Sequence, residues 1–126
     1  MSESSDTSNN PNGFTAGDNF FGQMREAGVA DDTFIQEIVE MFLDEGASCL
    51  QKIDEGFLAQ NTDLVRLYAH KLKSSFLMFD MEEAHSLALN LEKIDAQNFS
   101  TAQKDFGRLK TICNDIFQRL RMKYEK

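Results

Sequence analysis

Apolar side chains recur every three to four residues along four long stretches of the chain, which is the spacing of one face of an α-helix. Asp31-Asp32-Thr33 offers N-cap residues for the first long helix, which we expect to continue to about Ala59. Its apolar stripe stays in phase across Gly46, so the pattern favours a single helix, although a glycine costs roughly 1 kcal/mol against alanine inside a helix. The stripe comprises Ile35, Ile38, Val39, Phe42, Cys49, Leu50, Ile53 and Phe57.

Three further helices follow, separated by short polar breaks. Asn61-Thr62-Asp63 caps a helix that should run to about Phe79, Asp80 marks a tight turn, and the chain turns again near Asn98-Phe99-Ser100-Thr101. The inner face of the helix after Asn61 should carry Val65, Tyr68, Ala69, Leu72, Phe76 and Phe79. The inner faces of the next two should carry Ala84, Leu87, Ala88, Leu91 and Ile94, and then Phe106, Leu109, Cys113, Ile116, Phe117, Leu120 and Tyr124.

No stretch alternates apolar and polar residues with the period of a strand, so the predicted fold class is all-α. Four long helices joined by short connections predict an antiparallel, up-down four-helix bundle. Phe14, Phe20, Phe21 and Met24 precede Gly28 and predict an additional short N-terminal helix. Residues 14–126 then form one helical domain, whereas residues 1–13 have no apolar side chain after the initial methionine and are expected to be a disordered tail.

The net charge of −8 disfavours nucleic acid as a partner, because phosphates would repel the chain at long range. The start of the chain lacks the pattern of a signal peptide, and no segment has the ~18–20 apolar residues that cross a bilayer. We therefore expect a cytoplasmic protein with no membrane partner. Cys49 and Cys113 lack the spacing of a disulfide framework or a metal site and are interpreted as buried thiols. Apolar stripes that close on one another favour a monomer.

The segment "AHKLKSSFLMF", residues 69–79, places a histidine away from the apolar stripe of its helix. At about 100° per residue, His70 lies about 140° from the middle of the stripe and should point to solvent. Arg66 and Lys73 are four residues before it and three after, so two cations should lie beside the ring. A small rim suited to the docking of a partner should surround it, made of Leu67, Ser74, Leu77 and Met78.

An exposed imidazole is a competent nucleophile, since its ordinary pKa of about 6.5 leaves most of it neutral at pH 7. Phosphoryl transfer needs positioning and charge stabilisation, which neighbouring cations supply. A solvated surface histidine between lysines is also common, so geometry alone leaves both interpretations open. His85, beside Glu82 and Glu83 without a cation cluster, is interpreted as an ordinary surface residue. Two histidines are too few for a zinc centre, so no metal site is predicted.

"AHKLKSSFLMF" is similar to the signature of histidine-containing phosphotransfer (HPt) domains, roughly His-x-Leu-Lys-Gly-Ser/Ala followed by a glycine or small residue at the helix end. The resemblance extends from about Phe34 through the last helix. It implies that His70 accepts a phosphoryl group and that Lys73, one turn later, helps to hold it. It also implies that Glu92, in "LNLEKIDAQ", hydrogen-bonds the imidazole from the neighbouring helix.

Two positions depart from that signature. Ser74 replaces the glycine after the lysine, where a small side chain still permits close approach and its hydroxyl can hydrogen-bond a phosphoryl group. Asp80 replaces the glycine at the helix end, where aspartate tolerates turn conformations.

The resemblance implies a phosphocarrier in a multistep two-component phosphorelay, not an enzyme with turnover of its own. The partners would be receiver domains of response regulators or hybrid histidine kinases, and the Mg²⁺ would come from the receiver, with no cofactor held by this chain. No ATP-binding motif supports a kinase role. Two alternatives stay open at this point: an HPt-like module that docks a receiver or kinase without being phosphorylated, and a helical adaptor unrelated to phosphorelay.

Overall fold

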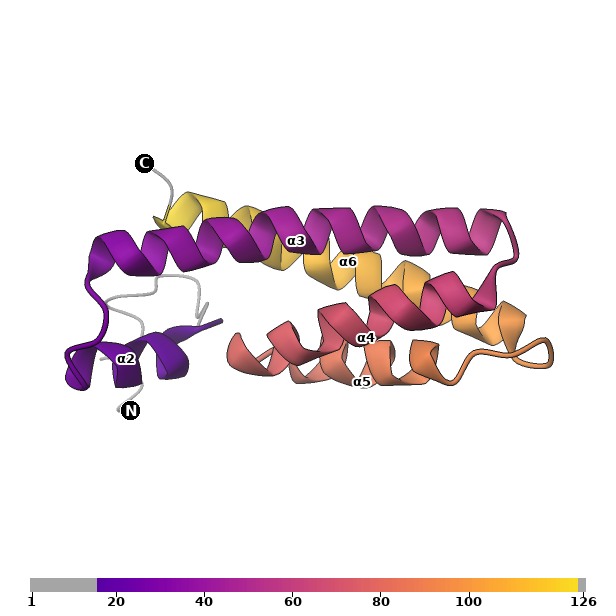
Figure 1. The fold of residues 1–126 in the computed structure, drawn as a ribbon, viewed down its shortest axis with the longest axis horizontal. Helices are drawn as coiled ribbons and strands as arrows, with labels where there is room; N and C mark the ends of the chain where they lie inside the picture. The colour runs from indigo at the N-terminus through magenta and orange to yellow at the C-terminus, as the bar shows by residue number, and fades with distance from the viewer. Residues whose placement is uncertain (1–15, 125–126) are drawn as a thin grey trace, which may run out of the picture.

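The computed structural model describes residues 16–124, and every regular element in that range is a helix (Figure 1). The predicted all-α class is therefore confirmed for this part of the chain. The expected tail at residues 1–13, and Phe14 with it, lie outside the described residues. In chain order the helices are α2 (Asp18–Glu26), α3 (Asp32–Leu58), α4 (Thr62–Met78), α5 (Glu82–Glu92) and α6 (Phe99–Tyr124).

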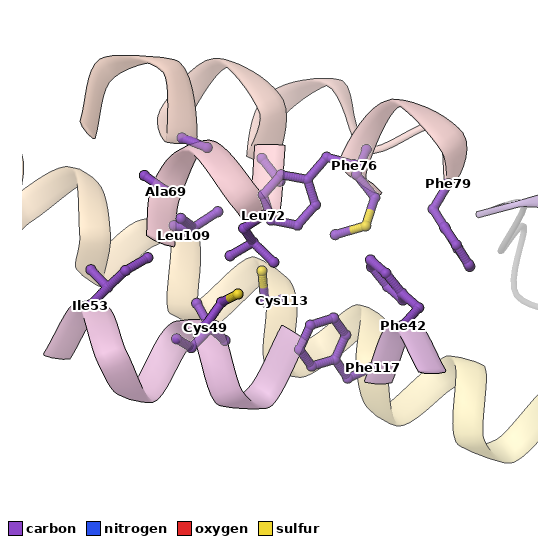
Figure 2. Close-up of a cluster of buried hydrophobic side chains, with 14 of the residues drawn as sticks. Phe42, Cys49, Ile53, Ala69, Leu72, Phe76, Phe79, Leu109, Cys113 and Phe117 are labelled. Atoms are coloured by element: carbon purple, nitrogen blue, oxygen red, sulfur yellow. The ribbon is translucent and has the colours of Figure 1, made fainter. Parts of the chain in front are cut away.

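Four of the helices enclose one core, because α3 contacts α4, α4 contacts α5, α5 contacts α6 and α6 contacts α3. In Figure 1, α3 and α6 run along the length of the molecule, α4 and α5 lie along one half, and α2 lies along the other end. The short helix predicted before Gly28 is thus present as α2. Figure 2 shows side chains of α3, α4 and α6 that meet in the shared interior, among them Cys49, Ile53, Leu72, Phe76, Leu109, Cys113 and Phe117.

The N-cap residues predicted for the helices α3 and α4 are confirmed. The Asp31 carboxylate accepts a hydrogen bond from the Phe34 backbone N–H (2.9 Å) at the start of α3. At the start of α4, the Asn61 side chain accepts one from the Leu64 N–H (3.1 Å). Each cap satisfies a backbone donor that the first helical turn leaves without a partner.

The turn after α4 decides where α5 returns along the bundle. The Met81 N–H donates to the Phe76 carbonyl (2.8 Å) and the Asp80 N–H to the Leu77 carbonyl (3.2 Å), which is the Schellman arrangement of a helix C-terminus. Asp80 adopts φ = 58°, a conformation that glycine takes at no steric cost and aspartate takes more easily than most residues. This φ is the physical reason why a glycine suits the position, and the buried Met81 that follows is the N-cap residue of α5.

The connection between α5 and α6 differs from the prediction in two respects. Helix α5 ends at Glu92, so Ile94 lies beyond it, although the side chain is buried as expected. The turn lies before Asn98 and not at residues 98–101: the Asp95 carboxylate accepts hydrogen bonds from the backbone N–H groups of residues 97 and 98 (both 2.9 Å). The Asn98 carbonyl then accepts from the Ala102 N–H (2.8 Å), so α6 already begins at Phe99.

Two buried glycines of α3 are sites of close approach. A Cβ atom at Gly46 would lie 2.5 Å from Cζ of Phe117 on α6. At Gly56 a Cβ would lie 2.8 Å from Cγ2 of Val65 and 3.2 Å from its backbone nitrogen. The sequence showed only the helix-propensity cost of these residues, whereas the structure shows that they let α6 and α4 pack against α3.

Gly56→Ala is expected to lower the free energy of unfolding by about 1–3 kcal/mol, because the added methyl group overpacks against the Val65 backbone. Gly107→Ala in α6 is the matched control, since apart from its chain neighbours and the backbone of its own helix no described atom lies within 4 Å of its Cβ position. That substitution should raise stability by up to about 1 kcal/mol through helix propensity alone. Urea denaturation measures both variants, and changes of the same sign would show that close approach at Gly56 is not what requires glycine.

Candidate functional site

The imidazole of His70 stands on the outer surface of α4, with 71% of its side chain exposed. Its neighbours Ala69 and Leu72 are buried in the core, so the helix itself determines that the ring faces outward. The rigid α4 backbone, fixed at both ends by the Asn61 cap and the turn at Asp80, therefore holds the ring in a defined position.

One carboxylate from the neighbouring helix holds both His70 and Lys73. Glu92 is the last residue of α5 and only 17% of its side chain is exposed. Its Oε1 accepts a hydrogen bond from Lys73 Nζ (2.7 Å), and its Oε2 contacts Nδ1 of His70. An ionised carboxylate can only accept, so Nδ1 carries the proton and donates it. Nε2, for which the described part of the chain supplies no partner, is left with a free lone pair.

The environment of Glu92 keeps this carboxylate charged. Partial burial raises its pKa, but hydrogen bonds from Lys73 and His70 and their charges together outweigh burial and bring the pKa below its usual value. The site therefore contains an ionised acceptor beside the imidazole at neutral pH. Sequence reasoning placed Glu92 near the ring but missed its ion pair with Lys73. The available signal was that residues 70 and 73 lie on one flank of α4, three positions apart.

Arg66, expected beside the ring, has other partners in the structure. Its guanidinium donates to the Ile94 carbonyl (2.5 Å) and to the Asp63 carboxylate (2.6 Å). The hydrogen bond to Ile94 connects α4 to the segment that follows α5. The ion pair with Asp63, three residues earlier on the same helix, is one that the sequence spacing could have indicated. A role for Arg66 in docking stays a prediction.

The residues of the predicted rim lie at the surface around His70. Leu67 and Leu77 are about half exposed, at 53% and 55%, and Met78 is exposed at 38%. Ser74 is exposed, and its hydroxyl donates to the Lys71 carbonyl (3.4 Å). The structure thus brings these side chains to one face of α4, while their docking role stays a prediction. His85, interpreted as a surface residue, is half-buried on α5.

A hollow of about 450 Å³ lies between α3 and α4, on the flank of α4 that faces away from Glu92. No pattern in the sequence predicted this hollow. Its lining contains neither the imidazole nor the Glu92 carboxylate, so the candidate nucleophile is on an open surface and not inside a pocket. The lining residues are Met41, Asp44, Glu45, Ser48, Cys49, Tyr68 and Lys71.

Both cysteines are free and buried, as predicted. Burial raises the pKa of the Cys113 thiol to about 12, so it is protonated and unreactive at neutral pH. Residues 16–124 contain no group of three or more His, Cys, Asp or Glu side chains that could hold a metal ion. In the same range, no helix has both the length and the apolar character needed to cross a membrane.

The Hpt domain family model matches residues 37–120, a range that contains His70, Lys73 and Glu92. The chain therefore belongs to the Hpt domain family, as its resemblance to that signature predicted. Hpt domains are helical phosphocarrier modules that interact with receiver domains in phosphorelays, so this protein takes part in phosphorelay signalling. No curated protein and no solved structure matches the chain with significant similarity.

Proposed function

We propose that this protein carries a phosphoryl group on Nε2 of His70, taking it from the aspartyl phosphate of one receiver domain and passing it to the aspartate of another. The observation that supports this most is the exposed imidazole whose Nδ1 is held by Glu92. That contact selects the tautomer in which Nε2 is the nucleophile and points it away from the protein. The scaffold in this proposal is the antiparallel up-down bundle, acting as a monomer in the cytoplasm.

The transfer step follows from that tautomer. The Nε2 lone pair attacks phosphorus, the P–O bond to the receiver's aspartate breaks, and its electron pair returns to the aspartate carboxylate. The phosphoryl group then lies near Lys73, whose ammonium group can offset part of its charge. Mg²⁺ would be contributed by the receiver, because this chain is proposed to hold no cofactor of its own. The same steps in reverse deliver the phosphoryl group to the second receiver.

A direct test is to incubate the protein with a receiver phosphorylated on its aspartate and to follow the label. The expected product carries phosphate that is acid-labile, stable to base, and located by mass spectrometry on the peptide containing His70. Binding of the receiver without transfer would overturn the carrier function and support the interaction module instead. Neither binding nor transfer to a panel of receivers would support an adaptor role outside phosphotransfer.

Leu77→Glu is expected to weaken receiver binding by about tenfold or more, because it places a carboxylate among the exposed apolar side chains of the rim. Leu77 is 55% exposed, so the helical circular dichroism spectrum should not change. Met122→Glu on α6 is the matched control, since Met122 is an exposed apolar residue (74%) away from α4. Equal affinities of the two variants, measured by calorimetry, would show that the rim does not dock the receiver.

A further inference from the structure

The hollow between α3 and α4 has a negatively charged lining. Asp44 and Glu45 of α3 line it, and within residues 16–124 neither carboxylate forms an ion pair. Lys71 of α4 also lines the hollow, but its ammonium group lies over the Tyr68 ring, 5.3 Å from the ring centroid. Two carboxylates against one ammonium group leave the lining with a net negative charge.

The helix that supplies these carboxylates extends the negative charge along the surface. Helix α3 contains no lysine or arginine before Lys52, whereas Glu37 and Glu40 precede the two carboxylates of the hollow. A partner's cationic side chain is therefore attracted to this part of α3, and an anionic one is repelled.

The rest of the lining offers apolar surface beside the charges. Met41 is an exposed apolar side chain (70%). Cys49 is only 2% exposed, lines the hollow and has no hydrogen-bond partner among the described residues. Burial raises the pKa of the Cys49 thiol and the charge of Glu45 raises it further, against the opposing charge of Lys71, so the thiol stays protonated. Charged groups beside apolar surface suit a long cationic side chain, whose methylene stem is apolar and whose head is charged.

The hollow begins where the rim ends on α4. Lys71 directly follows His70, and the rim residues Leu67 and Ser74 lie four positions before Lys71 and three after it, which is one helical turn in each direction. A stable protein–protein interface covers roughly 800 Å² on each partner, with about 20–30 residues. The rim and the imidazole supply only a few of these residues. A receiver that docks on the rim must therefore also cover neighbouring surface, and the hollow is within that reach.

We propose that the hollow receives one lysine or arginine side chain of the receiver that docks on the rim. Its cationic head lies between Asp44 and Glu45, and its methylene stem packs against Met41 and Tyr68. This proposal rests on the proposed phosphocarrier function. A receiver with an uncharged or acidic side chain at the facing position leaves both carboxylates without a partner when docking excludes water, and it binds more weakly. The hollow thereby selects among receivers.

The experiment compares wild type with the double variant Asp44→Asn/Glu45→Gln, and the probe is a receiver that exchanges phosphate with wild type. The variant should bind this receiver about tenfold or more weakly by calorimetry, because the enclosed cation loses its two anionic partners. The apparent KM for the receiver should rise by a similar factor, while the transfer rate at saturating receiver stays close to that of wild type. Raising the salt concentration from about 0.05 to 0.5 M should weaken binding by wild type much more than binding by the variant.

The matched control is Glu26→Gln/Glu82→Gln, which removes the same number of negative charges from exposed side chains of α2 and α5. Neither residue lines the hollow, so its affinity should equal that of wild type. Equal weakening by the two double variants would overturn the proposal, because net charge would then explain the effect. Unchanged affinity of Asp44→Asn/Glu45→Gln, or a lower saturating rate with an unchanged KM, would overturn it as well. Circular dichroism checks that both variants are folded.

A second measurement identifies the side chain that enters the hollow. Each exposed lysine and arginine of the probe receiver is replaced in turn by alanine. One of these substitutions should weaken binding to wild type by about tenfold and binding to Asp44→Asn/Glu45→Gln by little, as a double-mutant cycle shows for a direct contact. If no receiver substitution behaves in this way, the proposal is wrong even though phosphate still reaches His70. Absence of transfer to His70 from every receiver would instead overturn the phosphocarrier function.

Discussion

His70→Gln is expected to abolish phosphoryl transfer from a phosphorylated receiver and to leave the fold intact. Glutamine has no nucleophilic ring nitrogen, and no other described histidine has the same surroundings: His85 is half-buried on α5. Because 71% of the His70 side chain is exposed, its removal should change the free energy of unfolding by about 1 kcal/mol or less. Transfer of labelled phosphate and urea denaturation measure the two effects separately.

His85→Gln is the matched control and should accept phosphate at the wild-type rate. Labelling of His70→Gln at more than a few per cent of the wild-type level would show that another residue carries the phosphate. Loss of labelling in both variants would point to a general effect of the substitutions and not to the nucleophile. Receiver binding by His70→Gln should persist, since the rim residues Leu67, Leu77 and Met78 are unchanged.

The outward position of His70 could be predicted from sequence because a helix has a fixed angular period. Leu72 and Phe76 define the buried side of α4, and the position of residue 70 relative to them follows from geometry alone. The caps at Asp31 and Asn61 were predictable for a similar reason, since they depend on a side chain and a backbone donor only three residues apart.

What the sequence did not show are contacts between helices that are distant in the chain. The ion pair of Lys73 with Glu92 joins residues 19 positions apart, and Gly46 meets Phe117 of α6. Such contacts depend on how far one helix slides along another and on which rotamers the neighbours leave free. A pattern within one helix carries neither quantity, which is why the hydrogen bond of Arg66 to the Ile94 carbonyl beyond α5 was not predicted.

The chemical site and a main packing contact lie at different positions along α4. Lys73 and His70 form the chemical site near the middle of the helix, whereas Phe79 at its end connects three helices. The Phe79 ring stacks on Phe42 of α3, with centroids 4.0 Å apart, and meets Phe21 of α2 edge-on at 5.5 Å. Phe79 is completely buried, so stability and chemistry can be altered independently along one helix.

Phe79→Ala is expected to lower the free energy of unfolding by about 3–5 kcal/mol, because it removes a buried ring and leaves a cavity among α2, α3 and α4. This would be a large part of the total stability of a small domain, typically about 5–15 kcal/mol. Urea denaturation measures the loss, and hydrogen exchange should show the amides of α2 opening first. Labelling of the folded fraction should persist, since the contact of His70 with Glu92 does not involve this ring.

Phe34→Ala is the matched control, because Phe34 is 42% exposed and lies at the first turn of α3. It should cost about 1 kcal/mol or less, since little apolar area is lost from the interior. Equal costs for the two substitutions would show that the Phe79 ring does not hold α2 against the bundle. Unchanged exchange in α2 alongside a large loss of stability would instead place the contribution of Phe79 in its stacking on Phe42, so the pair of measurements separates the two contacts that the structure shows.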